Sequence, residues 1–566
     1  MEHIDVIIVG GGIAGLSLAR QLKMEKSDLS VVVLEREKSP LPSATHKVGE
    51  SSVEVGAHYY SHVLGLKEYL DTEHYEKLGL RYFFKSENGK LEDRPEWGVD
   101  GFIYKKSYQM NRGTMEDYLR KLVKEQGVNL IEGVEVEDIV ITEGQELNTV
   151  IYMQNNEQYK ISANWVVDAS GRSRLIQNKF DYKKKFEKEY NSVWFRVEGR
   201  SNIDEIVEKS NVKWHGRVNE PRWFSTNHMM GYGYWVWLIP LKGDFTSIGI
   251  VSSEDLHPFK NYNTKKKALQ WIEENEPQIA ELIEGVEMLD FKGIKNYSHS
   301  TSKVFSEDGW MCVGEAGVFA DPFYSVGNNL IAYANGITTS LICSGSPRAE
   351  LSDNIQYYNA YFISLAENLT NNIQDGYSFM GNGHKFAIKA IWDYFIGWGI
   401  SDPLFYHEIY LDPVKSKAVS KLLSKSIIAQ VKVIRLIKEW SERSEITGNF
   451  DFIDYLKDLP TLAHIFDMNL PPKKNSFDEV LTGIRYSIDR IEELANVIFF
   501  MAIEELYPEE YNKIDVKWID ITKISLNAEK WNEDGLFNYS TNPRDTQKMF
   551  NEISKALNIN PVLKYN

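Results

Sequence analysis

The fold is decided at the amino terminus by the stretch Asp5-Val6-Ile7-Ile8-Val9-Gly10-Gly11-Gly12-Ile13-Ala14-Gly15. Its β-branched first half is typical of a buried parallel strand. The glycines follow a GxGxxG pattern: Gly10 and Gly12 permit a tight turn and a close approach of the backbone to a pyrophosphate, and Gly15 permits tight helix packing on the strand. The pattern therefore predicts a dinucleotide site.

Residues just beyond this loop support the same prediction. Ile13 and Ala14 begin a helix whose amino-terminal end carries a partial positive charge that favours a phosphate. A second apolar strand, residues 30–34, ends at Glu35 and Arg36, where an acidic side chain can accept hydrogen bonds from a ribose. We expect an α/β (α+β) fold with a doubly wound nucleotide-binding domain, and we place these four residues at the cofactor.

Charge and composition exclude several classes of protein. The 64 basic and 81 acidic residues of the 566-residue chain give a net charge of −17, which argues against a nucleic-acid-binding protein. Only two cysteines are present, Cys312 and Cys343, so disulfides and zinc sites are not expected. No leader sequence or long apolar span is recognised, and we expect a cytoplasmic protein without a transmembrane segment.

Two further segments favour FAD over NAD as the nucleotide. Residues 165–172 form an apolar run that ends in a DxxG pattern at Asp168, and residues 310–316 contain Gly314 and Glu315. Both resemble elements of the flavoprotein hydroxylase superfamily, although that superfamily usually has aspartate where this chain has Glu315. Arg112 stands at the start of a predicted helix, where it would contact the pyrophosphate or instead serve as a capping or ion-pairing residue.

The two most informative runs lie in the middle of the chain. The first is Trp235-Val236-Trp237-Leu238-Ile239-Pro240, and the second is residues 319–327, which contain Asp321-Pro322-Phe323-Tyr324-Ser325-Val326-Gly327. Alternation places both indoles on one face of a strand, and we expect Pro240 to end that strand. A core strand of a large sheet would explain a WxW pair by itself.

Taken with the nucleotide elements, these two runs resemble those of flavin-dependent halogenases over about residues 1–345. The resemblance implies that reduced FAD reacts with O2 to form a C4a-hydroperoxide, that chloride or bromide attacks it to give hypohalous acid, and that a lysine receives this oxidant beside an aromatic substrate. It also implies that Trp235, Trp237, Ile239 and Pro240 separate flavin from substrate.

The lysine is identified by the same resemblance as Lys77, which precedes a glycine and an aromatic strand at residues 78–84. Its ammonium would hydrogen-bond hypohalous acid, or its neutral amine would form a haloamine, and the sequence does not separate these alternatives. A surface lysine near the end of a polar helix is the structural alternative. Lys85 and Lys47 are the rival candidates, and Val48 and Gly49, which follow Lys47, are expected to contact the flavin.

The halide is expected at Ser325, Val326 and Gly327, with Pro322 beside the flavin. In the flavin-dependent halogenases that this chain resembles, the main-chain amides of this segment face the halide. Paired amides at the start of a helix form an anion site. Tyr324 stands beside the position where tryptophan-specific members commonly place a glutamate. This departure favours phenols, pyrroles or carrier-linked aromatic compounds over free tryptophan.

The expected organisation is a 1–345 module followed by a helical region at 346–566. Within the module, the nucleotide-binding parts cover about 1–180 and 296–345, and an antiparallel substrate-side sheet is inserted at about 181–295. Residues 419–440 and 477–506 have helical periodicity. The helices are expected to cover the substrate cavity, with candidate wall residues Phe379, Trp392, Tyr394, Phe395 and Trp398, most of which would serve core packing instead.

Three other functions compete with halogenation: an FAD-dependent aromatic hydroxylase, a flavin-dependent reductase of isoprenoid or fatty chains, and a non-catalytic flavoprotein. No second nucleotide motif follows a strand, so we expect a separate NAD(P)H-dependent flavin reductase to supply FADH2. The expected partners are this reductase and an aromatic molecule, free or carrier-linked. A monomer and a homodimer are both compatible with the sequence.

Overall fold

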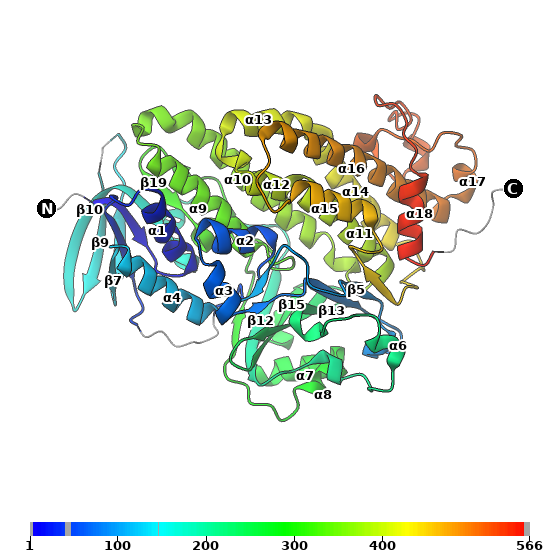
Figure 1. Ribbon diagram of the computed structural model, residues 1–566, viewed down its shortest axis with the longest axis horizontal. Helices are drawn as coiled ribbons and strands as arrows, with labels where there is room; N and C mark the ends of the chain where they lie inside the picture. The colour runs from blue at the N-terminus through cyan, green and yellow to red at the C-terminus, as the bar shows by residue number, and fades with distance from the viewer. Residues whose placement is uncertain (1–3, 40–46, 145–146, 560–566) are drawn as a thin grey trace.

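The structure is a computed structural model that describes residues 4–39, 47–144 and 147–559. Two eight-stranded sheets and a large helical region build it (Figure 1). The nucleotide-binding sheet lies at the left of Figure 1, the second sheet lies in the lower middle, and the helices that follow residue 345 extend across the top and right.

The nucleotide-binding sheet has a parallel centre with strand order β18-β19-β10-β1-β2-β7. The strands are β1 (Ile4–Val9), β2 (Val31–Glu35), β7 (Asn129–Glu132), β8 (Glu135–Val140), β9 (Asn148–Gln154), β10 (Glu157–Asp168), β18 (Phe305–Ser306) and β19 (Trp310–Cys312). Strand β1 pairs in parallel with β2 and β10, as its continuous apolar sequence predicts. Helices α1 (Ile13–Glu25) and α4 (Arg112–Glu125) pack against one another beside it. The expected nucleotide-binding fold is confirmed.

The second sheet has the order β16-β12-β15-β14-β13-β4-β5-β20. Its strands are β4 (Leu80–Phe84), β5 (Glu96–Gly98), β12 (Tyr190–Glu198), β13 (Thr226–Gly231), β14 (Tyr234–Leu241), β15 (Phe245–Ser253), β16 (Lys292–Ile294) and β20 (Phe452–Asp454). Short two-stranded ladders join β3 (Tyr75–Glu76) to β6 (Tyr108–Gln109) and β11 (Lys183–Lys184) to β17 (Ser300–Thr301).

Two expectations about this sheet need correction. It is not confined to residues 181–295, because β4 and β5 precede that range and β20 comes from the helical region. It is also not wholly antiparallel, because β13 pairs with β4, and β5 with β20, in parallel. Pro240 does not end β14: the strand continues to Leu241, and Pro240 lies opposite Thr246 near the hairpin turn.

Alternation along β14 is as the sequence predicts. Tyr234, Val236 and Leu238 join a core that contains Trp271 and Ile272 of α7 (Lys265–Asn275). The remaining side chains, those of Trp235, Trp237 and Ile239, point to the opposite face and join the large central core. Helices α7 and α8 (Pro277–Leu282) therefore cover one face of the sheet, as Figure 1 shows, and the tryptophans face the interior.

The helical region begins after α9 (Gly327–Cys343). It comprises α10 (Ser352–Gln374), α11 (Gly383–Ile396), α12 (Asp402–Tyr406), α13 (Pro413–Leu422), α14 (Ser424–Ser441), α15 (Pro460–Asn469), α16 (Phe477–Leu506), α17 (Pro508–Tyr511) and α18 (Gln547–Ala556). The predicted helix 477–506 coincides with α16, which begins with a Ser476–Glu479 capping box. The segment predicted at 419–440 is two helices that meet at Leu423. No helix within the described ranges is long and apolar enough to cross a membrane.

Four smaller helices stand outside this region. These are α2 (Glu54–His58), α3 (Lys67–Glu73), α5 (Leu175–Lys179) and α6 (Val212–His215). Helix α2 lies against α9, where Gly56 donates its N–H to the side chain of Asn329 over 2.9 Å. A Cβ at Gly56 would lie 2.8 Å from the Cβ of Asn328, so a glycine is required for this close approach.

Candidate active site: two cavities on either side of residues 321–330

The glycine loop has the geometry of a nucleotide cradle. Gly10 has φ +113°, and a Cβ there would lie 2.3 Å from the carbonyl oxygen of Ala169. A Cβ at Gly15 would lie 2.0 Å from the carbonyl oxygen of Gly10, which explains the close packing of α1 on β1. Gly12 has open space around its Cβ position and lines the crevice. These glycines occupy the positions that a pyrophosphate-binding turn requires.

Glu35 lies directly beside this loop at the end of β2. One of its carboxylate oxygens accepts a hydrogen bond from the N–H of Gly11, and the other accepts one from the N–H of Glu37 over 2.8 Å. Arg36 lines the same crevice and pairs with Glu37 at 3.5 Å. The acidic side chain therefore faces the place where a ribose is expected.

A crevice of about 1930 Å³ follows the loop and is lined by Ile13, Ala14 and the turn 169–173. It continues into a second cavity, because both are lined by Val48, Arg112, Gly314, Glu315 and Ile331. Asp168 does not line the crevice: its carboxylate accepts hydrogen bonds from the N–H groups of Ser170 at 3.0 Å and Ile176 at 2.8 Å. Asp168 thus holds the turn that the crevice uses.

Two of the residues shared by crevice and cavity, Arg112 and Glu315, form ion pairs. Arg112 pairs with Glu116 at 2.9 Å and donates to the carbonyl oxygen of Val48 over 2.5 Å. Lys47, one of the rival candidates to Lys77, also pairs with Glu116 of α4. This ion pair holds Lys47 away from the second sheet. Glu315 pairs with Arg172 at 3.5 Å. The ion-pairing role foreseen for Arg112 is therefore observed, and its position in the crevice is also compatible with a pyrophosphate contact, whereas the N-cap of α4 is Asn111.

The second cavity, here called the flavin-side cavity, encloses about 1060 Å³. Trp235, Trp237 and Ile239 of β14 form one wall and Pro322 another. Pro240 belongs to the same strand but does not line it. A Cβ at Gly249, opposite Trp237 on β15, would lie 2.2 Å from the indole, so only a glycine there lets the ring lie against the sheet. No motif in the sequence marks Gly249.

A buried hydrogen-bond network joins β14 to the 319–327 run. The Trp235 indole donates to the hydroxyl of Tyr377 over 2.9 Å, and Tyr377 donates to Asp321 over 2.9 Å. Tyr297 donates to the same carboxylate oxygen over 2.6 Å. Burial raises the pKa of Asp321 to about 6, against these hydrogen bonds, which lower it. The network fixes Trp235 relative to the next segment.

That segment, residues 321–330, stands between two cavities. Ser325 and Gly327 line the flavin-side cavity, whereas Tyr324 and Val326 line another cavity, here called the substrate-side cavity. Ser325 has φ +57°, an uncommon conformation for a residue other than glycine, and its N–H donates to the carbonyl oxygen of Pro322. Helix α9 begins at Gly327.

Aromatic rings fill the partition between these cavities. Phe323 is fully buried, and its ring centroid lies 5.3 Å from that of Tyr82 and 5.3 Å from that of Trp235. His228 lies 5.2 Å from Trp235, and burial lowers its pKa to about 3. No residue of β14 lines the substrate-side cavity among those described. The tryptophans therefore form the flavin-side layer of a thicker wall.

Lys77 lines the substrate-side cavity, which encloses about 1030 Å³. It is 2% exposed and follows β3, so it is not the surface residue of a polar helix. Its ammonium donates to the hydroxyl of Ser51 over 2.9 Å and to the carbonyl oxygen of Ser52 over 2.8 Å. Burial lowers the pKa of Lys77 to about 7, and Glu54 acts in the opposite direction. Lys85 is exposed and lines neither cavity.

Three carboxyl groups on this cavity were not foreseen, those of Asp393, Glu54 and Asp402. Glu54 begins α2, and Asp402 begins α12 after a π-helical turn at Gly397–Ser401. Burial raises the pKa of Glu54, while Lys77 and a hydrogen bond with Trp398 lower it. Burial, together with the charge of Glu54, raises the pKa of Asp402 well above its ordinary value. No motif marks any of these residues, so the sequence held no signal for them.

Tyr324 also lines the substrate-side cavity. Its hydroxyl donates to Asp393 over 2.6 Å, and Asp393 also accepts from Asn372 over 2.8 Å and pairs with the buried Lys389. Of the five expected wall residues, Tyr394 and Trp398 line this cavity. Phe379, Trp392 and Phe395 are buried in the core instead.

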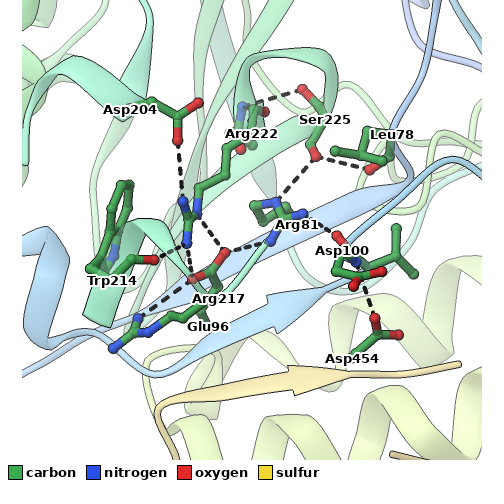
Figure 2. A network of polar contacts seen from close by, with 12 residues as sticks. Leu78, Arg81, Glu96, Asp100, Asp204, Trp214, Arg217, Arg222, Ser225 and Asp454 are labelled. Carbon is green, nitrogen blue, oxygen red and sulfur yellow. Dashed lines mark hydrogen bonds and ion pairs between the residues drawn. The ribbon is translucent and has the colours of Figure 1, made fainter. Parts of the chain in front are cut away.

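Figure 2 shows a second buried network, which holds the main chain at Leu78, the residue that follows Lys77 in the sequence. Ser225 donates to the carbonyl oxygen of Leu78 over 2.8 Å and accepts from Arg81 over 3.1 Å. Arg81 pairs with Glu96, which Arg222 also binds through two nitrogens at 2.7 Å and 3.0 Å. Burial alone would raise the pKa of Glu96, but these guanidinium groups hold it below its ordinary value. The network anchors β4 directly after the lysine.

Comparison with known families places this geometry. A family model described as tryptophan halogenase matches residues 86–378, more than half of the 566-residue chain. A model described as an NAD(P)-binding Rossmann-like domain matches residues 8–72, which contain the glycine loop.

Curated relatives agree with the family model. The chain is 27% identical to flavin-dependent halogenase chlA of Dictyostelium discoideum, over 74% of this chain and 73% of the relative. It is 29% identical to a 1H-pyrrole-2-carbonyl-[peptidyl-carrier protein] brominase of Pseudoalteromonas luteoviolacea, over 58% of this chain and 74% of that one. Each alignment covers most of the relative.

Solved structures share the fold at low identity. Halogenase PltM superposes with a TM-score of 0.64 at 14% identity, over 87% of this chain and 97% of that one. The flavin-dependent halogenase CmlS superposes with a TM-score of 0.57 at 18% identity, over 83% and 78%. These likenesses cover more residues than the 1–345 module contains, so they extend into the helical region.

Proposed function

The chain belongs to the tryptophan halogenase family of flavin-dependent enzymes, and from that membership we propose that it halogenates an aromatic ring with FADH2, O2 and chloride or bromide. One observation carries the proposal: residues 321–330 separate a cavity continuous with the nucleotide crevice from a cavity that contains Lys77. An oxidant can thus be made on one side and used on the other.

The residues present fit FAD. The glycine loop leaves room for a pyrophosphate at Gly12, Glu35 stands at the expected ribose position, and Val48 and Gly49 line the flavin-side cavity. Bound reduced FAD would supply, with O2, the two oxidising equivalents that convert halide into hypohalous acid. The chain's own contribution is to hold the cofactor and to wall off its ring with Trp235 and Trp237.

We place the halide at Ser325, Val326 and Gly327. Ser325 has a left-handed conformation directly before α9 begins at Gly327, and main-chain amides at a helix start favour an anion. Val326 and Gly327 line opposite cavities, so hypohalous acid formed here would lie at the boundary between them.

Lys77 would then receive the oxidant. Its ammonium form would hydrogen-bond the oxygen of hypohalous acid and orient the halogen, while its neutral form would take the halogen as a haloamine. With a pKa of about 7, both forms are populated near neutral pH. The ring carbon takes the halogen and loses its proton, and hydroxide from the hypohalous acid takes up that proton as water.

Glu54 would tune this lysine. It is a positioning residue, because the charge of Glu54 raises the pKa of Lys77 against the effect of burial. Tyr324 and Asp393, which line the same cavity, would contact a polar group of the substrate.

The substrate is a phenol or pyrrole, free or carrier-linked. Tyr324 occupies the position that departs from tryptophan-specific enzymes, and one relative is named as acting on a carrier-linked pyrrole. A separate NAD(P)H-dependent flavin reductase would provide FADH2, and the enzyme would work as a monomer or homodimer in the cytoplasm.

Aromatic hydroxylation is the alternative that needs an experiment. The enzyme is incubated with chemically reduced FAD, O2, bromide and a panel of phenols and pyrroles, and the product mass is measured. Bromide-dependent replacement of ring hydrogen by bromine supports the proposal. Addition of oxygen at the same rate with and without halide would identify a hydroxylase, and the absence of any product would leave a non-catalytic flavoprotein.

A further inference from the structure

One surface of the helical region has a charge opposite to that of the whole chain. Residues 413–438, which form α13 and most of α14, contain no acidic residue, although the chain has a net charge of −17. The cations of this basic surface are Lys415, Lys417, Lys421, Lys425, Lys432, Arg435 and Lys438. Carboxylates at its two edges pair with two of them, Asp412 with Lys415 at 3.2 Å and Glu439 with Arg435 at 2.7 Å.

Apolar side chains stand among these cations. Val414 is 80% exposed, Val431 is 67% exposed, and Ile427 and Ile428 are about half exposed. The other face of α14, with Val433 and Ile437, is buried in the core. Cations around exposed aliphatic side chains are typical of a protein-binding surface.

The basic surface adjoins the substrate-side cavity. Gln430 of α14 lines that cavity together with the half-buried Leu365 and Leu369 of α10, so the cavity reaches the surface between these helices. Lys432 and Arg435 line a separate surface groove of about 1330 Å³, shared with residues 522–534. Lys432 and Arg435 follow Gln430 by two and five positions, and residues at these spacings point in different directions on a helix. The exposed face of α14 therefore lies between the cavity at Gln430 and the groove at Lys432 and Arg435.

We propose that the basic surface of α13 and α14 docks an acidic protein that carries the aromatic substrate on a covalent tether. This inference rests on the proposed function, since the tethered ring must reach Lys77 through the cavity beside Gln430. Charge complementarity selects the partner, and the cavity beside the surface gives the tether a place to enter.

Other charged groups that face this surface do not neutralise it. Lys425 donates to the hydroxyl of Ser540 over 2.7 Å, and Lys417 lies over the ring of Tyr357 at 5.0 Å, so both neighbours are neutral. In the groove, Lys523 and Lys530 add positive charge, while Glu439 and Asp534 are the acidic residues. The surface thus stays positive across α14 and into the groove.

An anionic membrane is the competing occupant. Helices that lie in a membrane interface bury a continuous apolar face rich in large side chains. The continuous apolar face of α14 is already buried in the protein, and its exposed apolar side chains, Ile427, Ile428 and Val431, form a short β-branched group with Lys425 before it and Lys432 after it. A folded acidic protein fits this pattern better than a lipid bilayer.

The test measures binding first, so that it does not depend on catalysis. The probe is an acidic peptidyl carrier protein loaded with a pyrrole-2-carbonyl group, titrated against the full-length enzyme and against the triple variant Lys421→Glu, Lys425→Glu, Lys432→Glu. The control triple variant Lys265→Glu, Lys266→Glu, Lys267→Glu reverses the same number of exposed charges on α7.

We expect the α14-side variant to raise the Kd at least tenfold and the α7 control to change it less than twofold. Higher salt should weaken binding of the wild-type enzyme and have little effect on the variant. No binding by the wild-type enzyme, or equal losses in both variants, would overturn the proposal. Wild-type binding to vesicles with 30% phosphatidylserine and not to the carrier would assign the surface to a membrane instead.

A catalytic readout separates this proposal from the proposed function. Bromination of a free phenol should keep its wild-type kcat/KM in the α14-side variant, because the phenol does not need the surface. If the wild-type enzyme did not brominate a free phenol, the proposed function would be overturned. The binding measurement would then decide the docking surface by itself. Equal loss for free and tethered substrates in the variant would contradict docking.

Discussion

The charged side chains of the flavin-side cavity and of the substrate-side cavity have different kinds of partner. On the flavin side, Glu50 pairs with Arg196 at 3.1 Å, and Arg112 pairs with Glu116 at 2.9 Å. On the substrate side, the ammonium of Lys77 donates to a serine hydroxyl and a carbonyl oxygen, both of them neutral. Its nearest charge partner, Glu54, is itself a buried carboxyl with a raised pKa. The two flavin-side arginines thus pair with carboxylates, whereas the hydrogen bonds of Lys77 go to neutral groups.

This difference matches what each side is asked to do. Charges locked in ion pairs hold a cofactor without changing protonation state. A lysine with a pKa of about 7 changes protonation state within the pH range where enzymes work, and such groups are typical of sites of chemistry. The partition at residues 321–330 keeps the two environments apart, so its integrity should govern how efficiently oxidant reaches substrate.

The largest effect is expected from Lys77→Ala, which removes this lysine. Ring bromination should fall by about a thousandfold or more, while FAD binding measured by fluorescence stays within twofold. Lys85→Ala is the matched control, since Lys85 is exposed and lines neither cavity. Retention of more than a tenth of the bromination rate in Lys77→Ala would remove this lysine from the mechanism.

A smaller loss is expected when the partition is opened. Phe323→Ala removes the fully buried ring between Tyr82 and Trp235, so the fraction of O2 consumption that yields brominated ring should fall about tenfold. Phe195→Ala is the control, because Phe195 is equally buried but packs toward α7. Equal coupling in the two variants, measured by oxygen electrode and product mass, would show that Phe323 is not a barrier.

A change in pH dependence should follow from Glu54→Gln. Glu54 raises the pKa of Lys77, so its removal should lower that pKa below about 7 and shift the pH midpoint of bromination downward. At pH 7 the ammonium fraction then falls. A lower rate at pH 7 would identify the ammonium as the active form, and a higher rate would identify the haloamine route. An unchanged midpoint would contradict the coupling.

The smallest effect is expected at the network behind Lys77. Ser225→Ala leaves the carbonyl oxygen of Leu78 and the Nε of Arg81 without this partner, at a cost of about 1–3 kcal/mol in the free energy of unfolding. Bromination should fall a few fold. Ser487→Ala, which removes a similar buried hydroxyl in α16, should cost similar stability without slowing bromination. Equal rates in both variants would show that the network does not position the lysine.

Local patterns predicted the parts of this comparison that depend on neighbouring residues. The glycine loop, the alternation of Trp235 and Trp237 and the α16 helix follow from spacing along the chain, and the structure has each of them. Lys77 is predicted by the family resemblance. In the structure it lines a cavity, and its pKa is lowered by burial.

Parts built from distant residues could not be predicted. Glu54 and Asp402 stand 348 positions apart and meet only because α12 packs on α2. Strand β20 reaches the second sheet from residue 452, although the surrounding sequence is helical. The sequence could not distinguish Trp398, which lines a cavity, from Trp392, which is buried in the core. Both are tryptophans in apolar helical segments, so their local sequence patterns are alike.

The central claim, that oxidant is made in one cavity and used in the other, is tested by measuring both products in one Lys77→Ala reaction. Reduced FAD, O2 and bromide are supplied with a phenol, and hypobromous acid that leaves the enzyme is trapped with monochlorodimedone. We predict that the variant forms trapped hypobromous acid at close to the wild-type rate of oxidant formation and forms almost no brominated phenol by its own catalysis when the trap is in excess. Loss of both products together would contradict the separation of the two cavities.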